Sequence, residues 1–204
     1  QTRDVKTAVT YFDGIGRPVQ SVVKKGSMAT STSATDLVSP VIYDVYGREV
    51  YKYLPFASTG NDGAFKIDPF QQQAAFYNTK LNGQSESYFY GKTDYEASPL
   101  NRSVKTYAPG NSWVGNQKGI ESNYFTNTLA DDVRVFSVTD ITDDWGTYFE
   151  TGIYTSGELF KSIIKDEHGK QVVEFKDKEG KVILKKIQLS GSQDLGTGIG
   201  YSGW

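Results

Sequence analysis

At 204 residues the chain has room for one large or two small domains, and its hydrophobic content of 37% exceeds that of a disordered chain. Its 22 basic and 24 acidic residues are mixed along the sequence, so no large positive field attracts phosphates and nucleic acid is not an expected partner. The absence of cysteine excludes thiol nucleophiles, disulfides and cysteine-ligated zinc, and we expect no cofactor.

The aromatic residues indicate a fold made mainly of strands. The chain has 14 Tyr and 11 Phe against one Met and one His, and aromatic side chains fit the half-buried surface of a sheet. No stretch approaches the roughly eighteen consecutive apolar residues of a membrane-spanning helix, so we expect no direct membrane insertion. Residues 1–10 lack the apolar stretch of a secretory signal, which in a secreted parent chain would lie upstream or have been removed.

A short unit recurs four times, in which an aspartate is followed three residues later by a glycine and then by a basic residue. An aspartate at the first position of a turn accepts a local backbone N–H, and a glycine takes the positive-φ position that ends a type I turn with a bulge. Each unit is therefore predicted to form the tip of a β-hairpin. The predicted turn residues are Asp13 and Gly16, Asp44 and Gly47, Asp166 and Gly169, and Asp177 and Gly180.

The last two tips predict a meander. Residues 171–176 separate them and residues 182–187 follow, which gives strands of about six residues between turns. Upstream, residues 147–154 and 159–164 are predicted to extend the same sheet.

One segment, near residues 69–82, breaks the β pattern and is predicted to be an amphipathic helix docked on the sheet. Asp68 supplies an N-cap acceptor, Pro69 suits the first helical position, and Gln71 completes a sequence close to a capping box. The apolar residues that recur at helical spacing are Phe70, Ala74, Tyr77 and Leu81.

These elements predict a single, mainly β domain over residues 1–189. It consists of antiparallel hairpins and meanders with hairpin units near 11–25, 41–54 and 159–189, plus the one docked helix. Residues 190–204 are rich in Gly and Ser and have little to bury, so we expect a tail that is mobile or truncated.

The recurring unit resembles the YD repeat of RHS proteins, in which Tyr precedes the Asp and Arg follows the Gly. The second copy, Tyr43-Asp44-Val45-Tyr46-Gly47-Arg48, has both features, and the first differs in having Phe12 directly before Asp13. The last two copies depart further, with Lys165 and Lys176 in place of Tyr and Lys170 and Lys181 in place of Arg.

A second resemblance spans nearly the whole chain. It is carried by the segments YFDGIGRPVQ (11–20), YLPF (53–56), DPF (68–70), SPLNR (98–102) and APG (108–110). These look like the domain of unknown function that precedes the RHS repeats in many bacterial surface proteins.

The resemblance implies a long secreted or cell-surface parent protein, in which YD repeats wind β-hairpins into a shell and a variable C-terminal region often carries the activity. The Asp-Pro-x-Gly autoproteolysis motif of the RHS core has no counterpart in this sequence, so neither self-cleavage nor toxin activity is expected of this segment. We expect a non-enzymatic structural segment that caps or begins the β-shell, with the remainder of the parent chain as its partner.

A carbohydrate-binding module is the main alternative. Trp113, Trp145, Trp204 and the run Tyr88-Phe89-Tyr90 offer flat rings to sugars, and cell-surface glycans would then be the partner. Trp113, in a loop rich in Gly and Asn, is the candidate ligand contact. Tyr88 and Tyr90 share one face of a strand with Phe89 opposite, which is typical of ordinary packing.

A glycosidase-like enzyme is the second alternative. The acidic pairs Asp131-Asp132 and Asp143-Asp144 are adjacent in sequence, whereas a glycosidase needs two facing carboxyls roughly 5 to 10 Å apart. We interpret both pairs as solvated loop charges. The single histidine, His168, lies in a predicted turn without a nucleophile elbow nearby, and no catalytic residue is assigned.

Two further groups of polar residues have structural interpretations. Asp140, Asp143, Asp144 and Gly146 superficially resemble a calcium loop, but the spacing misses the EF-hand pattern and favours a turn between strands, with no metal site assigned. Arg17 and Arg48 are expected to pair with neighbouring carboxylates or to stack on Tyr rings across strands.

Overall fold

The computed structural model describes residues 5–29, 33–140 and 142–204, and the chain divides into two compact units, residues 1–119 (unit 1) and residues 120–204 (unit 2). Residues 1–4, 30–32 and 141 of the domain predicted over 1–189 lie outside the described residues. The single domain stays a prediction, because compactness of each unit does not measure whether the two unfold together. Within the described residues, no helix combines the length and apolarity that crossing a membrane requires.

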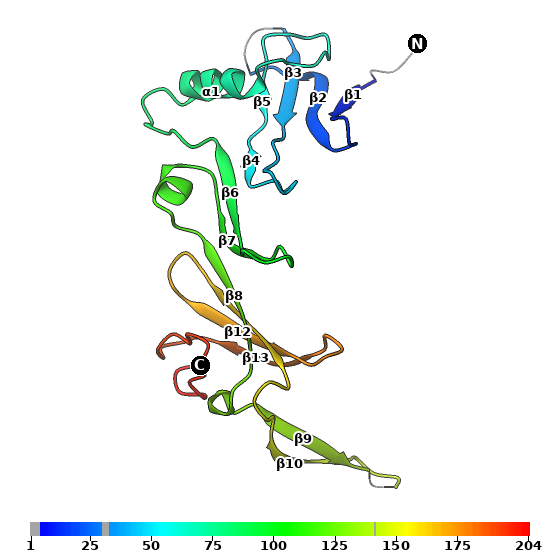
Figure 1. Ribbon diagram of the computed structural model, residues 1–204, viewed down its shortest axis with the longest axis vertical. Coiled ribbons are helices and arrows are strands. Elements are labelled where there is room, and N and C mark those ends of the chain that lie inside the picture. Colours follow the sequence, from blue (N-terminus) through cyan, green and yellow to red (C-terminus); the bar gives the residue numbers. More distant parts are fainter. Residues whose placement is uncertain (1–4, 30–32, 141) are drawn as a thin grey trace. The chain divides into compact units, whose positions relative to one another are not determined.

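Over the residues that the structure describes, the mainly β fold with antiparallel strands and one docked α-helix is confirmed (Figure 1). The elements of unit 1 are β1 (Ala8–Phe12), β2 (Pro18–Ser27), β3 (Thr35–Pro40), β4 (Tyr51–Tyr53), β5 (Phe56–Ala57), α1 (Pro69–Lys80), β6 (Tyr90–Tyr95), β7 (Ser103–Tyr107) and the π-helical turn η1 (Asn111–Gly115). Those of unit 2 are β8 (Ile120–Thr126), the 3-10 turn η2 (Leu129–Asp131), β9 (Arg134–Thr139), β10 (Thr147–Ile153), β11 (Phe160–Lys165), β12 (Gln171–Lys176) and β13 (Val182–Ile187).

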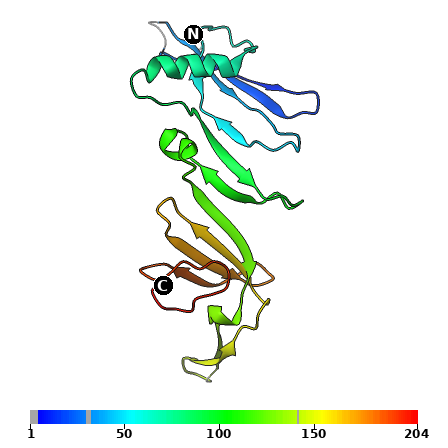
Figure 2. The same cartoon turned by 60° about the vertical axis from the view of Figure 1, so that its left-hand side comes forward.

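The first sheet of unit 1 has the strand order β1-β2-β3-β5, and α1 lies against it (Figure 2). Alternation along β2 and β3 buries Val22 and Val38, which form a small core with Phe56. Phe76 and Tyr77 of α1 pack on this core, so aromatic rings supply much of its apolar surface.

The helix differs in detail from the sequence prediction. It ends at Lys80, and the side chain of Asp68 makes no capping hydrogen bond; the start is set by Pro69, whose fixed φ suits the first turn and which has no N–H to satisfy. The buried face centres on a polar residue, because Gln73 is only 2% exposed. Its Nε2 donates to the carbonyl oxygens of Leu54 (2.8 Å) and Phe89 (2.9 Å).

Strands β4, β6 and β7 pair antiparallel in that order. The tip predicted within residues 41–54 is present, but its flanks do not pair with each other as a hairpin: β3 pairs with β2 and β5, whereas β4 pairs with β6. This turn therefore leads the chain from one sheet to the next.

The main sheet of unit 2 has the strand order β13-β12-β11-β8, and the predicted meander of residues 159–189 is confirmed. The prediction that residues 147–154 extend this sheet is wrong. The edge of β11 that β10 would need is occupied by β8, with Phe160 opposite Thr126 and Lys165 opposite Glu121. Strand β10 therefore pairs with β9 as a separate two-stranded ribbon. The core of unit 2 consists of Val133, Leu159, Ile163, Val173 and Phe175.

The tail over residues 190–204 also differs from the prediction. The N–H groups of residues 189, 190 and 191 all donate to the carbonyl oxygen of Gly203, Trp204 packs on the core, and Asp194 is 4% exposed. The composition suggested mobility, but the glycines allow the tail to approach the backbone of unit 2 closely, and polar contacts hold it there.

Candidate functional site

All four Asp-x-x-Gly units are tight turns with the same hydrogen bonds. In the first, the Asp13 N–H donates to the Arg17 carbonyl (2.8 Å), the Gly16 N–H donates to the Asp13 carbonyl (3.1 Å), and Asp13 Oδ1 accepts from the N–H groups of Ile15 and Arg17. The glycines lie in the left-handed region, with φ of 83° at Gly16, 78° at Gly47, 82° at Gly169 and 84° at Gly180.

In unit 1 the basic residue after the glycine completes each turn. Arg17 Nε donates to Asp13 Oδ2 (2.8 Å), and Arg48 Nε donates to Asp44 Oδ2 (2.9 Å). One carboxylate oxygen thus binds backbone N–H groups and the other binds the guanidinium. The backbone hydrogen bond from the arginine, and then its side chain, lower the pKa of Asp13 and of Asp44.

Each of these guanidinium groups also stacks on an aromatic ring of the following tip. Arg17 Cζ lies 4.5 Å from the ring centroid of Tyr43, which directly precedes Asp44, and Arg48 Cζ lies 4.8 Å from that of Tyr95 at the end of β6. The expected pairing with carboxylates and contact with Tyr rings are both present, although Tyr43 lies between β3 and β4 and not in a strand. We call Arg17, Tyr43, Arg48 and Tyr95 the arginine–tyrosine ladder.

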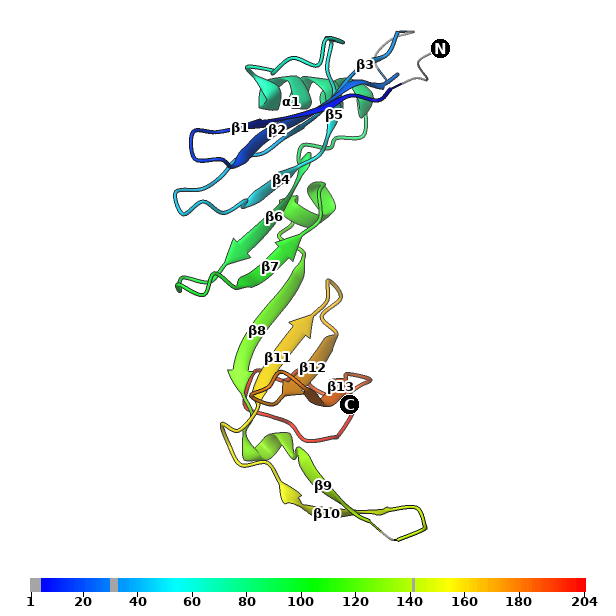
Figure 3. The ribbon, with the colours of Figure 1, turned by 90° about the vertical axis from the view of Figure 1, so that its right-hand side faces the viewer.

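The ladder reaches a third tip, between β6 and β7, that the sequence did not reveal. The Glu96 N–H donates to the Arg102 carbonyl (3.0 Å), and Arg102 Nη2 donates to Glu96 Oε2 (2.8 Å). The bound Arg102 guanidinium lowers the pKa of Glu96 to about 2. Arg48 Nη1 donates to Asn101 Oδ1 (3.2 Å) in the same loop, and Figure 3 shows the three tips along one side of unit 1.

The two tips of unit 2 keep the backbone of the turn without the guanidinium. Asp166 Oδ1 accepts from the N–H groups of His168 and Lys170, and Lys170 Nζ donates to the Leu189 carbonyl instead of to the aspartate. His168 is exposed in this turn. Lysine at these positions therefore preserves the turn but not the stacking geometry of arginine.

The predicted aromatic contacts are distributed over both units. Trp113, the candidate ligand contact, is half-buried in η1, and Lys118 Nζ lies 5.6 Å from its ring. In unit 2, Trp145 is 90% exposed in the turn between β9 and β10, whereas Trp204 packs on the core. Phe89 is buried and stacks on Tyr77, which is ordinary packing.

Within residues 5–29, 33–140 and 142–204, no three His, Cys, Asp or Glu residues come together in a group that could hold a metal ion. Interpreting Asp131 as a solvated loop charge is wrong, because its side chain is 1% exposed. Its neighbour Asp132 accepts from Arg134 Nη2 (2.8 Å). Asp131 at the end of η2 is thus buried, whereas the side chain of Asp132 is 30% exposed.

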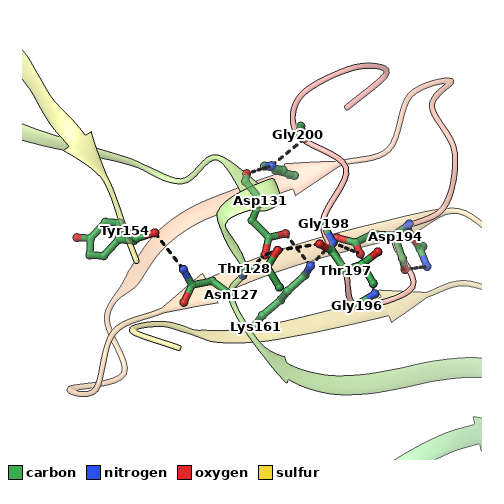
Figure 4. Close-up of polar contacts among 12 residues, drawn as sticks. Asn127, Thr128, Asp131, Tyr154, Lys161, Asp194, Gly196, Thr197, Gly198 and Gly200 are labelled. Carbon is green, nitrogen blue, oxygen red and sulfur yellow. Dashed lines mark hydrogen bonds and ion pairs between the residues drawn. The ribbon is translucent and has the colours of Figure 1, made fainter. Parts of the chain in front are cut away.

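Asp131 belongs to a buried charged group that sequence reasoning missed (Figure 4). Lys161 Nζ lies 2.6 Å from Asp131 Oδ1 and 2.6 Å from Asp194 Oδ2, and the Lys161 side chain is 0% exposed. We call Lys161, Asp131, Asp194 and Lys186 the buried lysine cluster. It joins η2, β11, β13 and the tail.

Lys186 provides the second cation of the cluster. Its Nζ donates to the backbone carbonyls of Asp131 (2.6 Å) and Gly200 (2.8 Å) and lies 4.2 Å from the ring centroid of Tyr201. Burial lowers the pKa of this amine. Lys161 thus pairs with two aspartates and Lys186 with two backbone carbonyls, so both buried cations have polar partners.

The glycines of the tail make the cluster possible. The N–H groups of Gly196 and Gly198 donate to Asp194 Oδ1 (2.8 and 3.2 Å), and Thr128 Oγ1 donates to the Thr197 carbonyl (2.7 Å). A Cβ at Gly198 would lie 2.7 Å from the Asp131 nitrogen. In the tail, the sequence signal was the recurrence of Gly at every second position, residues 196, 198 and 200, after Asp194.

The fold and the ladder define a β-hairpin protein whose successive tips in unit 1 are linked by stacked arginines. Residues 1–126 match a domain of unknown function (DUF6443), and the chain belongs to that family. No curated protein matches the chain, and no solved structure does. The matched residues include the whole arginine–tyrosine ladder, whereas the buried lysine cluster lies beyond them.

Proposed function

We propose that this chain is a non-enzymatic structural segment, which caps or begins the β-shell of a secreted or cell-surface protein of the RHS type. Its partner is the remainder of the parent chain. The DUF6443 match over residues 1–126 is compatible with this proposal, and the resemblance of the Asp-x-x-Gly units to YD repeats supports it.

The ladder is the observation that carries the proposal. Arg17 of the first tip stacks on Tyr43 of the second, and Arg48 of the second stacks on Tyr95 of the third. Each tip therefore contacts its neighbours through the same pair of residue types, as in arrays whose units stabilise only the next unit along. Such contacts supply a reason for Tyr before the Asp and Arg after the Gly.

A scaffold also accounts for the chemistry of the tips. Asp13, Asp44 and Glu96 each hold the arginine of their own turn, so these carboxylates are occupied in turn formation. A cap of this kind covers a sheet edge that would otherwise pair with other chains. It requires rigid hairpins and no catalytic group.

Limited proteolysis of the intact parent chain tests the scaffold. The variant that combines Arg17→Ala with Arg48→Ala removes the arginines of the ladder, and we expect faster cleavage within the repeats that follow this segment. Arg134→Ala is the matched control, since Arg134 pairs with Asp132 and Glu150 in unit 2 and belongs to no ladder step. Equal cleavage rates for the double variant and the control would contradict the proposal.

A glycan array separates the scaffold from the carbohydrate-binding alternative. We expect no binding above background for the chain or for Trp113→Ala. Reproducible binding that Trp113→Ala abolishes would replace the scaffold by a recognition module.

A further inference from the structure

The buried lysine cluster places an amine against two carboxyl groups away from solvent. Lys161 Nζ lies 2.6 Å from an oxygen of each, and the exposed fractions of the side chains are 0% for Lys161, 1% for Asp131 and 4% for Asp194. The ring centroid of Phe175 lies 5.7 Å from the same nitrogen. Transfer of one proton from this ammonium to a contacting carboxylate leaves a neutral amine, which is the nucleophilic form of lysine, within reach of the other carboxyl group.

We propose that Lys161 condenses with Asp194 to form an intramolecular amide bond, with Asp131 as the group that relays the proton. The product joins β11 covalently to the tail. The cluster thereby becomes a modification site at which the chain is its own substrate.

The reaction balances without a further reactant. Asp131 accepts a proton from the Lys161 ammonium, and the amine lone pair attacks Cγ of Asp194 to form the C–N bond. The second amine proton and the proton held by Asp131 leave with Oδ2 as one water molecule when the C–O bond breaks. An ammonium and a carboxylate thus become an amide and water, with no oxidant, reductant or net proton change.

The hydrogen bonds of the two carboxylates distinguish their roles. Asp194 Oδ2 faces Lys161, and Oδ1 accepts from the N–H groups of Gly196 and Gly198. Two fixed backbone donors on one oxygen are the arrangement that stabilises the negative charge of a tetrahedral intermediate.

The surroundings of Asp131 suit the relay. Its Oδ2 accepts from the N–H of Thr128 (2.7 Å), and its Oδ1 faces Lys161. This capping box fixes the carboxylate on η2 while one oxygen stays in contact with the amine. The same oxygen can therefore take the proton and return it.

The mass of the purified chain, with its sequence unchanged, tests whether the bond has formed. We expect a mass about 18 Da below that of the sequence, the loss of one water molecule, which persists after denaturation. Trypsin should then yield residues 135–165 joined to residues 187–204, because an acylated Lys161 is not cleaved. A chain at full mass, with cleavage after Lys161, overturns the proposal.

Two isosteric variants test the assignment of roles. Asp194→Asn retains an acyl group, so the bond still forms with loss of ammonia, about 17 Da. Asp131→Asn removes the relay, and this chain should keep its full mass while circular dichroism shows the folded β signal. Loss of ammonia from Asp131→Asn, with residues 119–134 joined to residues 135–165, would assign the bond to Asp131 and overturn the proposed roles.

Discussion

The guanidinium carbon of Arg17 lies 4.5 Å from the ring centroid of Tyr43, while its Nε donates to Asp13 within its own turn. One side chain therefore closes a hairpin tip and stacks on the next. Lysine supplies the charge but no planar guanidinium to lie over a ring, and the lysine-bearing tips of unit 2 keep only the backbone of the turn.

A double-mutant cycle measures this stacking. We expect the free energy of unfolding to reveal a coupling of about 0.5–1 kcal/mol between Arg17→Ala and Tyr43→Leu, since a cation over an aromatic ring at an exposed site contributes on this scale. Tyr43→Phe is the control, because it keeps the ring and removes only the hydroxyl that donates to the Pro18 carbonyl. Additive effects of Arg17→Ala and Tyr43→Leu in urea denaturation would show that the stack contributes nothing.

The first tip contains a matched pair of glycines. Gly16 lies in the left-handed region with φ of 83°, whereas Gly14 does not. At both positions a Cβ would meet no heavy atom within 4 Å. Gly16→Ala should therefore destabilise by about 1 kcal/mol through backbone strain alone, whereas Gly14→Ala should be neutral or slightly stabilising. Equal thermal midpoints for the two variants would mean that the left-handed conformation is not required.

The turns were predictable because their signals are local. The aspartate accepts from the N–H groups two and four positions later, and the glycine adopts a positive φ. Both act within five consecutive residues. The third tip escaped recognition because Glu96 replaces the aspartate and its arginine follows by six positions rather than four. The order of tyrosine, acid and arginine was nevertheless present in the sequence.

Gln73 provides a test of the polar centre of α1. Gln73→Leu buries the apolar side chain well but leaves the carbonyls of Leu54 and Phe89 without this donor, so we expect a loss of about 1–3 kcal/mol. Gln71→Leu, at an exposed position of the same helix, should change stability little. If the two variants unfold at the same urea concentration, the Gln73 hydrogen bonds are not part of the fold's stability.

The buried lysine cluster could not be predicted from the sequence, because its signals are not local as those of the turns are. Its contacts join distant parts of the sequence, since Asp131 lies 30 residues from Lys161 and 55 residues from Lys186, and nothing local marks Lys161 on β11 as an inward-facing lysine. Burial of Lys161 follows from the tail folding back over β11, which composition alone argued against. Alternation along β11 does place Lys161 and Ile163 on one buried face, and that was the available signal.

The third tip should give the chain a specific sensitivity to acid. Arg102 lowers the pKa of Glu96 from its ordinary 4.5 to about 2. A depressed folded-state pKa contributes stability that is present above the unfolded value and is lost as pH falls toward the folded one. Glu96→Gln removes this contribution, so its urea midpoint should lie below that of the unmodified chain at about pH 7, and the two should converge between about pH 4.5 and about pH 2.

The other carboxylates with lowered pKa values, such as Asp13 and Asp44, are present in both chains and cancel in the comparison. Glu179→Gln, at an exposed position of the last tip, is the matched control and should track the unmodified chain at every pH. A difference in urea midpoint between Glu96→Gln and the unsubstituted chain that stays constant across this pH range would contradict the prediction. The substitution must matter less as the Glu96 carboxylate becomes protonated, because the ionised form is the one that Arg102 stabilises.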